Sequence, residues 1–348
     1  MPNSALSAYG YDDTVARAVG ELAEPDAVAG RVSRVDRGEC TVATADGPVR
    51  AASDSQRSQG ASAPAIGDWV TVSDDPGLGL VIDSVIPRST ALVRRDPAEE
   101  TLDQVLAANV DVVAVVHGLG RPVNPARLER FLVLAWDSGA SPALVLTKSD
   151  LGDGPAARRG LLELFDDVEV FVTSAVTGEG IDELRRFAAR RGTLVFIGES
   201  GSGKSRLANA LLGSDVQEVG DVRSGDAKGR HTTSTRDLLP IPTGGVLIDT
   251  PGVRAVGLWD ADGAVDRVFA DVIAAAEGCR FRDCTHRVEP GCAVQEAVAG
   301  GGLDPARLAR YHRLHEELAG QAADMEERAR RQDKGRNRRS SPRRSRRR

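Results

Sequence analysis

The feature that most constrains the fold of this chain is the stretch Leu194–Ser205, which reads L-V-F-I-G-E-S-G-S-G-K-S. Four apolar residues, enough for a buried strand, lead directly into Gly198, four spacer residues and Gly203-Lys204-Ser205. A stretch typical of a helix follows over Arg206–Leu212. This order of strand, loop and helix is that of the phosphate-binding loop G-x-x-x-x-G-K-[ST]. It predicts that the chain binds a nucleoside triphosphate; the alternative is an ordinary turn between a strand and a helix.

The chemistry of phosphate binding accounts for the residue types in this loop. Glycines let backbone N–H groups curl around phosphate oxygens, where a Cβ would obstruct them. We expect Lys204 to contact the β- and γ-phosphates and Ser205 to ligate Mg²⁺, while the following helix points its positive end at the anion. The expected nucleotide-binding residues here are Gly198, Glu199, Ser200, Gly201, Ser202, Gly203, Lys204, Ser205 and Arg206.

The N-terminal part of the chain changes pattern at residue 31. Residues 1–30 contain one plausible helix, Asp13–Leu22, and no recognisable chemistry. Short alternating stretches then predict strands at Arg31–Asp36, Glu39–Ala45, Pro48–Ala52, Asp68–Val72 and Leu78–Ile86. Five short strands in about sixty residues fit a barrel of the oligonucleotide/oligosaccharide-binding (OB) type, and another small β-barrel fits nearly as well.

From Thr101 onward, apolar runs alternate with amphipathic helical stretches. The runs that predict buried strands are Asp111–His117, Pro142–Leu146 and Val168–Val172. The stretches that predict helices are Asn124–Gly139, Ala156–Phe165 and Ile181–Arg190. Repeated β–α order predicts a mostly parallel sheet with helices on both faces.

Polar residues follow two of these strands, at the sheet edge where ligands bind. Thr147-Lys148-Ser149-Asp150 resembles the [N/T]-K-x-D guanine motif, with Thr147 in place of the commoner Asn. Asp150 can accept hydrogen bonds from guanine N1–H and the 2-amino group, a donor pair that adenine lacks, and the Lys148 stem can cover the base. Alone, T-K-S-D also fits a helix N-cap. A weaker signal, Ser174-Ala175, resembles the segment whose amide meets guanine O6, and together these motifs favour guanine.

Two further stretches resemble the switches of GTPases. Gly229–Thr235 reads G-R-H-T-T-S-T, like the first switch, in which a threonine hydroxyl ligates Mg²⁺; Thr232 and Thr233 are both candidates. Asp249-Thr250-Pro251-Gly252 follows an apolar run and resembles the D-x-x-G second switch, a simple turn being the alternative. Asp249 would hold Mg²⁺ through water, and Gly252 would offer its amide to the γ-phosphate.

Three cysteines and a histidine lie close together near the C-terminus, in the pattern Cys279-x4-Cys284-x-His286-x5-Cys292. This set suits a closed tetrahedral Zn²⁺ site, hence a structural one; the alternative, unrelated core cysteines, does not fit the polar neighbours. Helices are predicted at Ala293–Ala299 and Asp304–Gly320. Cys40 reads as a small buried residue, and so few cysteines in 348 residues favour a reducing cytoplasm.

The formal net charge of −6 hides an uneven distribution. Residues 328–348 contain twelve Lys/Arg and one Asp, a net +11, so the other 327 residues carry −17. A short basic tail on an acidic body suggests a polyanionic partner, although a solvated tail without a role has the same composition. No stretch approaches the ~20 apolar residues of a membrane span.

The order of the motifs is informative. Ordinary GTPases carry the phosphate loop first, then the switches, then the guanine motifs; here residues 147–150 and 173–175 precede the loop. With a barrel before it and a Cys/His cluster after it, the chain resembles the circularly permuted GTPase family of ribosome small-subunit-dependent GTPase A over nearly its whole length. Short local sequences also resemble this family: I-G-D-W-V (66–70), I-P-R (86–88), A-N-V-D (108–111) and G-R-H-T-T (229–233).

This resemblance implies a multidomain α/β protein: a leader (1–30), an OB-type barrel (31–95), a circularly permuted P-loop GTPase domain (96–258), an α-helical zinc-binding domain (259–327) and a disordered basic tail (328–348). It implies a monomeric cytoplasmic enzyme that uses Mg²⁺ with GTP, carries one structural Zn²⁺ and binds no membrane. It also implies binding to the small (30S) ribosomal subunit and its rRNA, with hydrolysis of GTP to GDP during late maturation, stimulated by the subunit.

The last element of this interpretation is the catalytic group. Val253 stands where Ras-like GTPases carry a water-orienting glutamine. In the resembling family a histidine in the first switch is a proposed catalytic residue, which makes His231 the candidate beside Lys204; an exposed histidine without a role fits the sequence equally. Two rival functions are a P-loop nucleotide kinase or ATPase, and an RNA-binding module with a regulatory nucleotide site. Asp150, Asp249 and the intact loop argue against both.

Overall fold

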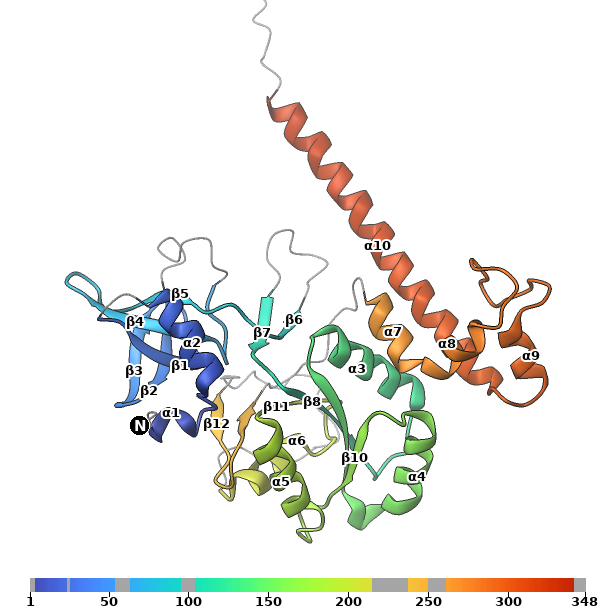
Figure 1. The fold of residues 1–348 in the computed structure, drawn as a ribbon, viewed down its shortest axis with the longest axis horizontal. Helices are drawn as coiled ribbons and strands as arrows, with labels where there is room; N and C mark the ends of the chain where they lie inside the picture. Colours follow the sequence, from blue (N-terminus) through green and yellow to red (C-terminus); the bar gives the residue numbers. More distant parts are fainter. Residues whose placement is uncertain are drawn as a thin grey trace, which may run out of the picture. The chain divides into compact units, whose positions relative to one another are not determined.

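The computed structural model describes residues 4–23, 26–53, 63–94, 104–214, 237–249 and 261–340 (Figure 1). The chain divides into two compact units. The first unit comprises Met1–Arg95 and Thr101–Val256, and the second comprises Asp96–Glu100 and Gly257–Arg348. The finer division into five segments stays a prediction.

The N-terminal strands form a closed barrel in the order β1-β2-β3-β5-β4. These strands are β1 (Val28–Val35), β2 (Glu39–Thr44), β3 (Gly47–Ala52), β4 (Trp69–Asp75) and β5 (Gly79–Val85). Neighbours pair antiparallel except β3 and β5, which meet in parallel. Alternate side chains fill the interior: Val32, Cys40, Val42, Ala51, Val70, Val72 and Ile82. The predicted five-stranded barrel is confirmed, and burial raises the pKa of the Cys40 thiol to about 11.

Two helices precede the barrel. These are α1 (Ser4–Ser7) and the predicted helix α2 (Asp13–Leu22), which begins after Asp12 because the Asp12 carboxylate accepts the Val15 N–H at 2.9 Å. Leu6 and Val19 pack with Trp69 and Ile86 in a second apolar cluster. The N-terminal segment is therefore part of the folded unit.

The second half of this unit is a six-stranded sheet in the order β10-β9-β8-β11-β13-β12. Its strands are β8 (Val112–Gly118), β9 (Ser141–Thr147), β10 (Glu169–Val172), β11 (Thr193–Ile197), β12 (Leu238–Pro240) and β13 (Val246–Ile248). All pairs are parallel except β12 with β13, so the mostly parallel sheet is confirmed, while the short antiparallel edge strand was not predicted.

Four helices connect these strands: α3 (Pro125–Asp137), α4 (Gly154–Leu164), α5 (Ile181–Arg191) and α6 (Lys204–Leu212). Helices α5 and α6 bury Leu184, Phe187 and Leu211 against the sheet face that carries Val116 and Phe196. Every residue of β8 is buried, as expected for a strand covered on both faces. Helix α3 contacts β8 and β9.

A small antiparallel sheet of β6 (Ala91–Arg94) and β7 (Gln104–Ala108) lies between barrel and sheet in the sequence. Sequence analysis missed it because each strand has only four or five residues and no clear alternation. The paired residues of the two strands are 10 or more positions apart in the sequence, so no short hairpin turn marks their pairing.

Three stretches singled out in the sequence meet where the barrel joins the sheet. Asp68 of I-G-D-W-V is fully buried and forms a bidentate ion pair with Arg88 of I-P-R, both N–O distances being 2.7 Å. Asn109 of A-N-V-D donates from Nδ2 to the Gly67 carbonyl at 3.1 Å. Asp111 of the same stretch accepts the Thr193 N–H at 2.7 Å. These motifs therefore hold the barrel against the start of β11.

Arg31 of β1 is the centre of this junction. Its side chain is 2% exposed, and its guanidinium donates to the carbonyls of Tyr9, Gly67 and Asn109 and to Thr193 Oγ1. These four acceptors come from the N-terminal helices, the barrel, the A-N-V-D turn and strand β11 in turn. One cation thus joins four segments that are distant in the sequence.

The Arg31 guanidinium also lies over the Trp69 ring, 4.9 Å from its centroid. Burial lowers the pKa of Arg31 to about 10, although Asp111 and Asp68 oppose this shift. A group with this pKa stays charged at neutral pH. Because a buried charge must be hydrogen-bonded, the four protein acceptors take the place of the water that burial removed.

The second unit is helical. Its helices are α7 (Asp262–Val268), α8 (Ala270–Ala276), α9 (Ala293–Ala299) and α10 (Pro305–Ser340). Arg307 of α10 is 2% exposed; it lies over the Phe269 ring and donates to the Val268 carbonyl and the Asp271 carboxylate. This buried arginine joins α10 to the α7–α8 corner.

The expected disordered tail is corrected in part, because α10 continues as a helix to Ser340 and includes residues 328–340. Charge alone suggested disorder, but Arg, Ala, Gln and Lys, which make up most of residues 328–340, are good helix formers. Residues 341–348 lie outside the described part of the chain. Within the described ranges, no helix has both the length and the apolar character that a bilayer span requires.

We predict that Arg31→Ala destabilises the first unit by about 3 kcal/mol, because four acceptors lose a charged donor. The measurement is urea unfolding followed by tryptophan fluorescence. Arg50→Ala is the matched control: Arg50 pairs with Asp36 and Glu39 on the barrel surface, and its loss is expected to leave the urea midpoint close to that of the parent. Equal losses in the two variants would contradict the role given to Arg31.

Candidate nucleotide and metal sites

The phosphate-binding loop follows β11 and requires its glycines. Gly198, Gly201 and Gly203 have φ values of +140°, +75° and +97°, in the region that favours glycine. A Cβ on Gly198 would lie 2.3 Å from the Val116 carbonyl oxygen. Backbone conformation and close approach to β8 therefore both demand the pattern that the sequence shows.

Lys204 begins α6, and its ammonium lies within the loop. Nζ donates to the carbonyls of Gly198 and Glu199 at 2.9 and 2.6 Å. Ser205 is the second residue of α6, at the end where the first N–H groups of a helix are not bonded within it. The predicted lysine and serine thus stand at a helix N-terminus suited to phosphate.

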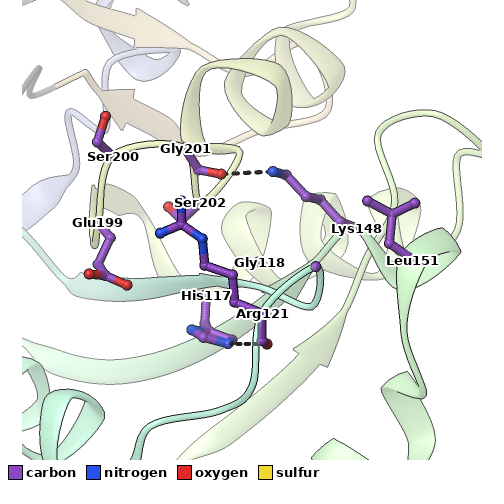
Figure 2. Close-up of a pocket in the computed structure, with 10 residues that line it drawn as sticks. His117, Gly118, Arg121, Lys148, Leu151, Glu199, Ser200, Gly201 and Ser202 are labelled. Atoms are coloured by element: carbon purple, nitrogen blue, oxygen red, sulfur yellow. Dashed lines mark hydrogen bonds between the residues drawn. The ribbon is translucent and has the colours of Figure 1, made fainter. Parts of the chain in front are cut away.

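The guanine motif at the end of β9 is bonded directly to the phosphate loop. Lys148 Nζ donates to the Gly201 carbonyl at 2.8 Å, as Figure 2 shows. The Thr147 hydroxyl donates to the Ser202 carbonyl. Lys148 has φ +60°, a left-handed conformation that turns the chain at the strand end. A threonine in place of the usual asparagine therefore still anchors the loop.

Asp150 is positioned by the second guanine segment. Ser174 is fully buried, and its hydroxyl donates to Asp150 Oδ1 at 2.6 Å while accepting the N–H groups of Val176 and Thr177 at 3.2 Å. The weak Ser174-Ala175 signal thus meets the T-K-S-D signal in the fold. One oxygen of Asp150 is fixed by Ser174, and the carboxylate is oriented toward the same pocket as Ala175.

Ser149, the third residue of the motif, has a different environment. Its hydroxyl donates to Glu179 at 2.5 Å, and it lines neither of the two cavities at this edge of the sheet. Glu179 lies in the loop before α5, and its carbonyl accepts the Ser174 N–H at 3.0 Å. Ser149 therefore braces the loop that carries Ser174 and Ala175.

Two cavities adjoin on either side of Lys148. The smaller, of about 140 Å³, contains the residues predicted to read the base and is lined by Thr147, Lys148, Asp150, Leu151, Ala175, Val176, Gly203, Arg206 and Leu207. The larger, of about 270 Å³, runs along the phosphate loop (Figure 2) and is lined by His117, Gly118, Gly120, Arg121, Lys148, Leu151, Glu199, Ser200, Gly201 and Ser202. Predicted base-binding and phosphate-binding residues thus line one continuous edge.

The contribution of the end of β8 and of the segment after it was not predicted. His117 and Arg121 line the larger cavity, and the His117 ring lies 3.3 Å from the Arg121 carbonyl. Arg127 of α3 pairs with Glu199 of the loop at 2.5 Å. The signal available was the position of this segment: it follows an apolar run next to the loop strand in the sheet.

The switch residues are described only in part. Asp249 follows β13, and its N–H donates to the Asp237 carbonyl at 2.9 Å, so the predicted Mg²⁺ residue lies at the end of the strand next to β11. His231, Thr232, Thr233 and Gly252 lie outside the described residues. Their roles remain predictions.

The four predicted metal ligands of the second unit come together. The ligand atoms of Cys279, Cys284, His286 and Cys292 all lie within 4.8 Å of one another. Cys279 Sγ lies 3.9 Å from Cys292 Sγ and 3.5 Å from His286 Nδ1. A tetrahedron with Zn–S of ~2.3 Å and Zn–N of ~2.0 Å requires separations of about 3.8 and 3.5 Å. The cluster therefore has the size that holds a zinc ion.

Glu289 organises the loop that carries two of these ligands. Its carboxylate accepts the N–H groups of Thr285, Arg287 and Val288 at 3.0, 2.9 and 3.1 Å, and it also accepts the Thr285 hydroxyl. The Thr285 hydroxyl and these backbone N–H groups lower the pKa of Glu289. The carboxylate thereby fixes the turn in which His286 adopts φ +58°.

Comparison with known proteins shows which family this chain resembles. A family model for the RsgA GTPase matches residues 85–259, slightly more than half of the chain. The small ribosomal subunit biogenesis GTPase RsgA of Streptomyces coelicolor is 47% identical over 341 residues, 94% of this chain and 90% of that relative. The chain belongs to the RsgA GTPase family. A second RsgA relative, from Methanosarcina acetivorans, is 39% identical over 86% of this chain and 82% of its own length.

Solved structures agree with the RsgA assignment. YjeQ from Thermotoga maritima matches with a TM-score of 0.62 and 28% identity, covering 84% of this chain and 99% of that chain. YloQ, described as a circularly permuted GTPase, matches with a TM-score of 0.61 and 22% identity over 86% of this chain and 97% of its own. The permuted fold predicted from the motif order is confirmed.

We predict that Glu289→Gln weakens zinc retention about tenfold, because the amide nitrogen cannot accept the loop N–H groups that the carboxylate holds. Competition with a chromogenic chelator measures this in reducing buffer. Glu316→Gln is the control, since Glu316 pairs with Arg287 on the surface and contacts none of the loop amides that Glu289 binds. Zinc retention that is equal in both variants would remove Glu289 from this role.

Proposed function

We propose that this chain hydrolyses GTP during biogenesis of the small ribosomal subunit. The observation that carries the proposal is the direct bonding of Thr147 and Lys148 to the phosphate loop, which joins base recognition to phosphate binding in one rigid edge. The relatives named small ribosomal subunit biogenesis GTPases support the biological setting.

Different residues of the site bind the base, the phosphates and the metal ion of GTP. Asp150 selects guanine, Lys148 covers the base, and Lys204 contacts the β- and γ-phosphates, which stabilises the charge that develops on transfer. Ser205, Asp249 and either Thr232 or Thr233 would hold Mg²⁺, which neutralises the phosphate oxygens when bound. Gly252 would offer its amide to the γ-phosphate.

The attacking water needs a group that orients it. Val253 can neither donate nor accept a hydrogen bond, so the chain lacks the glutamine of Ras-like enzymes. We assign this role to His231, in the first switch beside the Mg²⁺ threonine. Slow turnover by the isolated protein follows, because a group on a separate segment must be brought to the water by the bound subunit.

The second unit fits a role in RNA contact. A zinc ion at the Cys/His cluster would be structural, since four protein ligands fill a tetrahedron. The basic sequence at 328–348 is suited to rRNA phosphates. We infer a monomeric cytoplasmic protein whose barrel and second unit dock on the small subunit, with GTP and GDP as its nucleotide partners.

The test is GTP turnover by the full chain with and without isolated small subunits. We expect subunits to raise turnover by at least about a hundredfold, the size of a positioned general-base effect. His231→Ala should lose most of this stimulation while keeping GTP affinity, and Lys204→Ala should abolish turnover altogether. Fast turnover without subunits would refute the partner requirement, and full stimulation in His231→Ala would exclude the histidine.

A further inference from the structure

The barrel contacts the edge of the nucleotide domain through an irregularity in β1. The register of β1 against β2 shifts between Val32 and Arg34, as at a β-bulge. In a regular strand these two residues would face the same side, and Val32 lies in the barrel core. The shift instead lets Arg34 face away from the barrel core. Strand β1 lies beside strand β12 there (Figure 1).

Arg34 meets an acidic partner there. Its Nε lies 3.3 Å from Oδ1 of Asp237, the residue before β12, and the two side chains are 38% and 35% exposed. Nε is buried, and its alignment with the carboxylate falls short of a hydrogen bond, so the contact is an ion pair. The interaction therefore depends on charge.

Asp237 is in turn bonded to the Mg²⁺ residue. Its carbonyl accepts the N–H of Asp249 at 2.9 Å, and Leu238 pairs with Ile248 in the ladder between β12 and β13. Three links therefore lead from the barrel to Asp249: an ion pair, a residue backbone and a hydrogen bond.

A second barrel contact supports the same strand end. Gly67, in the turn before β4, has φ +89°, and a Cβ there would lie 3.2 Å from Ile248 Cδ1 and 2.2 Å from the Ala108 carbonyl oxygen. The barrel thus touches β13 immediately before Asp249 and holds Asp237 immediately before β12. Both contacts converge on one carboxylate.

We propose that Arg34 is a positioning residue for the Mg²⁺ site: through Asp237 it holds the backbone of Asp249 where the carboxylate serves the metal. This inference rests on the proposed function, because it takes Asp249 as a Mg²⁺ residue. It adds that the barrel is part of the nucleotide machinery, so that the N-terminal domain and Mg²⁺-bound nucleotide stabilise each other.

The experiment measures dissociation of fluorescent GDP from the full chain at graded Mg²⁺ concentrations and in excess EDTA. Arg34→Met keeps the length of the side chain and removes its charge. We expect the Mg²⁺ concentration for half-maximal GDP retention to rise about two- to fivefold, the range of a partly exposed ion pair. The rate in EDTA should match that of the parent, since the phosphate loop and guanine pocket are untouched.

Arg50→Met is the matched control, because it makes the same change to a barrel arginine whose partners, Asp36 and Glu39, lie within the barrel. It should leave the Mg²⁺ dependence unchanged. Asp237→Asn should reproduce the Arg34→Met shift, and the exchange Arg34→Asp with Asp237→Arg should restore at least part of it.

Three results would overturn the inference: no shift in Arg34→Met, an equal shift in Arg50→Met, or an equal acceleration in EDTA. The last two would mean general damage to the fold. A parent protein that binds GDP without any dependence on Mg²⁺ would overturn the proposed function itself and this inference with it. A parent with normal Mg²⁺ dependence and an unshifted Arg34→Met would overturn the inference alone.

Discussion

The site depends on the contact between the end of β9 and the phosphate loop. The carbonyls of Gly201 and Ser202 in this loop need donors, and Lys148 and Thr147 supply them. The same lysine lines both cavities, so the residue predicted to cover the base also holds the predicted phosphate loop. This arrangement explains why the motifs can be permuted in the sequence: the contact requires that β9 and β11 end at the same edge of one sheet, whatever their order along the chain.

The junction between barrel and sheet follows from a related constraint. Closing a barrel against a parallel sheet buries backbone groups of both, and these must find partners. Arg31 and the Asp68–Arg88 pair provide them, at the cost of desolvating charged groups. The result is one unit in which β11, the strand of the phosphate loop, is anchored at its first residue by the barrel.

Local patterns gave most of the fold and the main site residues. The glycine spacing of the loop, the alternation of the barrel strands and the Cys/His spacing each encode their structure within a few residues. The missed features are those that depend on tertiary contact: the β6–β7 sheet, the antiparallel β12, the Arg127–Glu199 pair and Glu289 in the loop of the Cys/His cluster. The helical stretch at 328–340 was missed for another reason, because its charge obscured its helix propensity.

The central claim is that Asp150, held by Ser174 beside the phosphate loop, reads guanine. The most direct measurement is competition of fluorescent GDP by GTP and by XTP, for the parent and for Asp150→Asn. We expect the parent to prefer GTP strongly and the variant to reduce this preference at least about tenfold, since one charged hydrogen bond is worth ~1.5–3 kcal/mol. An unchanged ratio, with GDP still bound, would mean that Asp150 does not read the base.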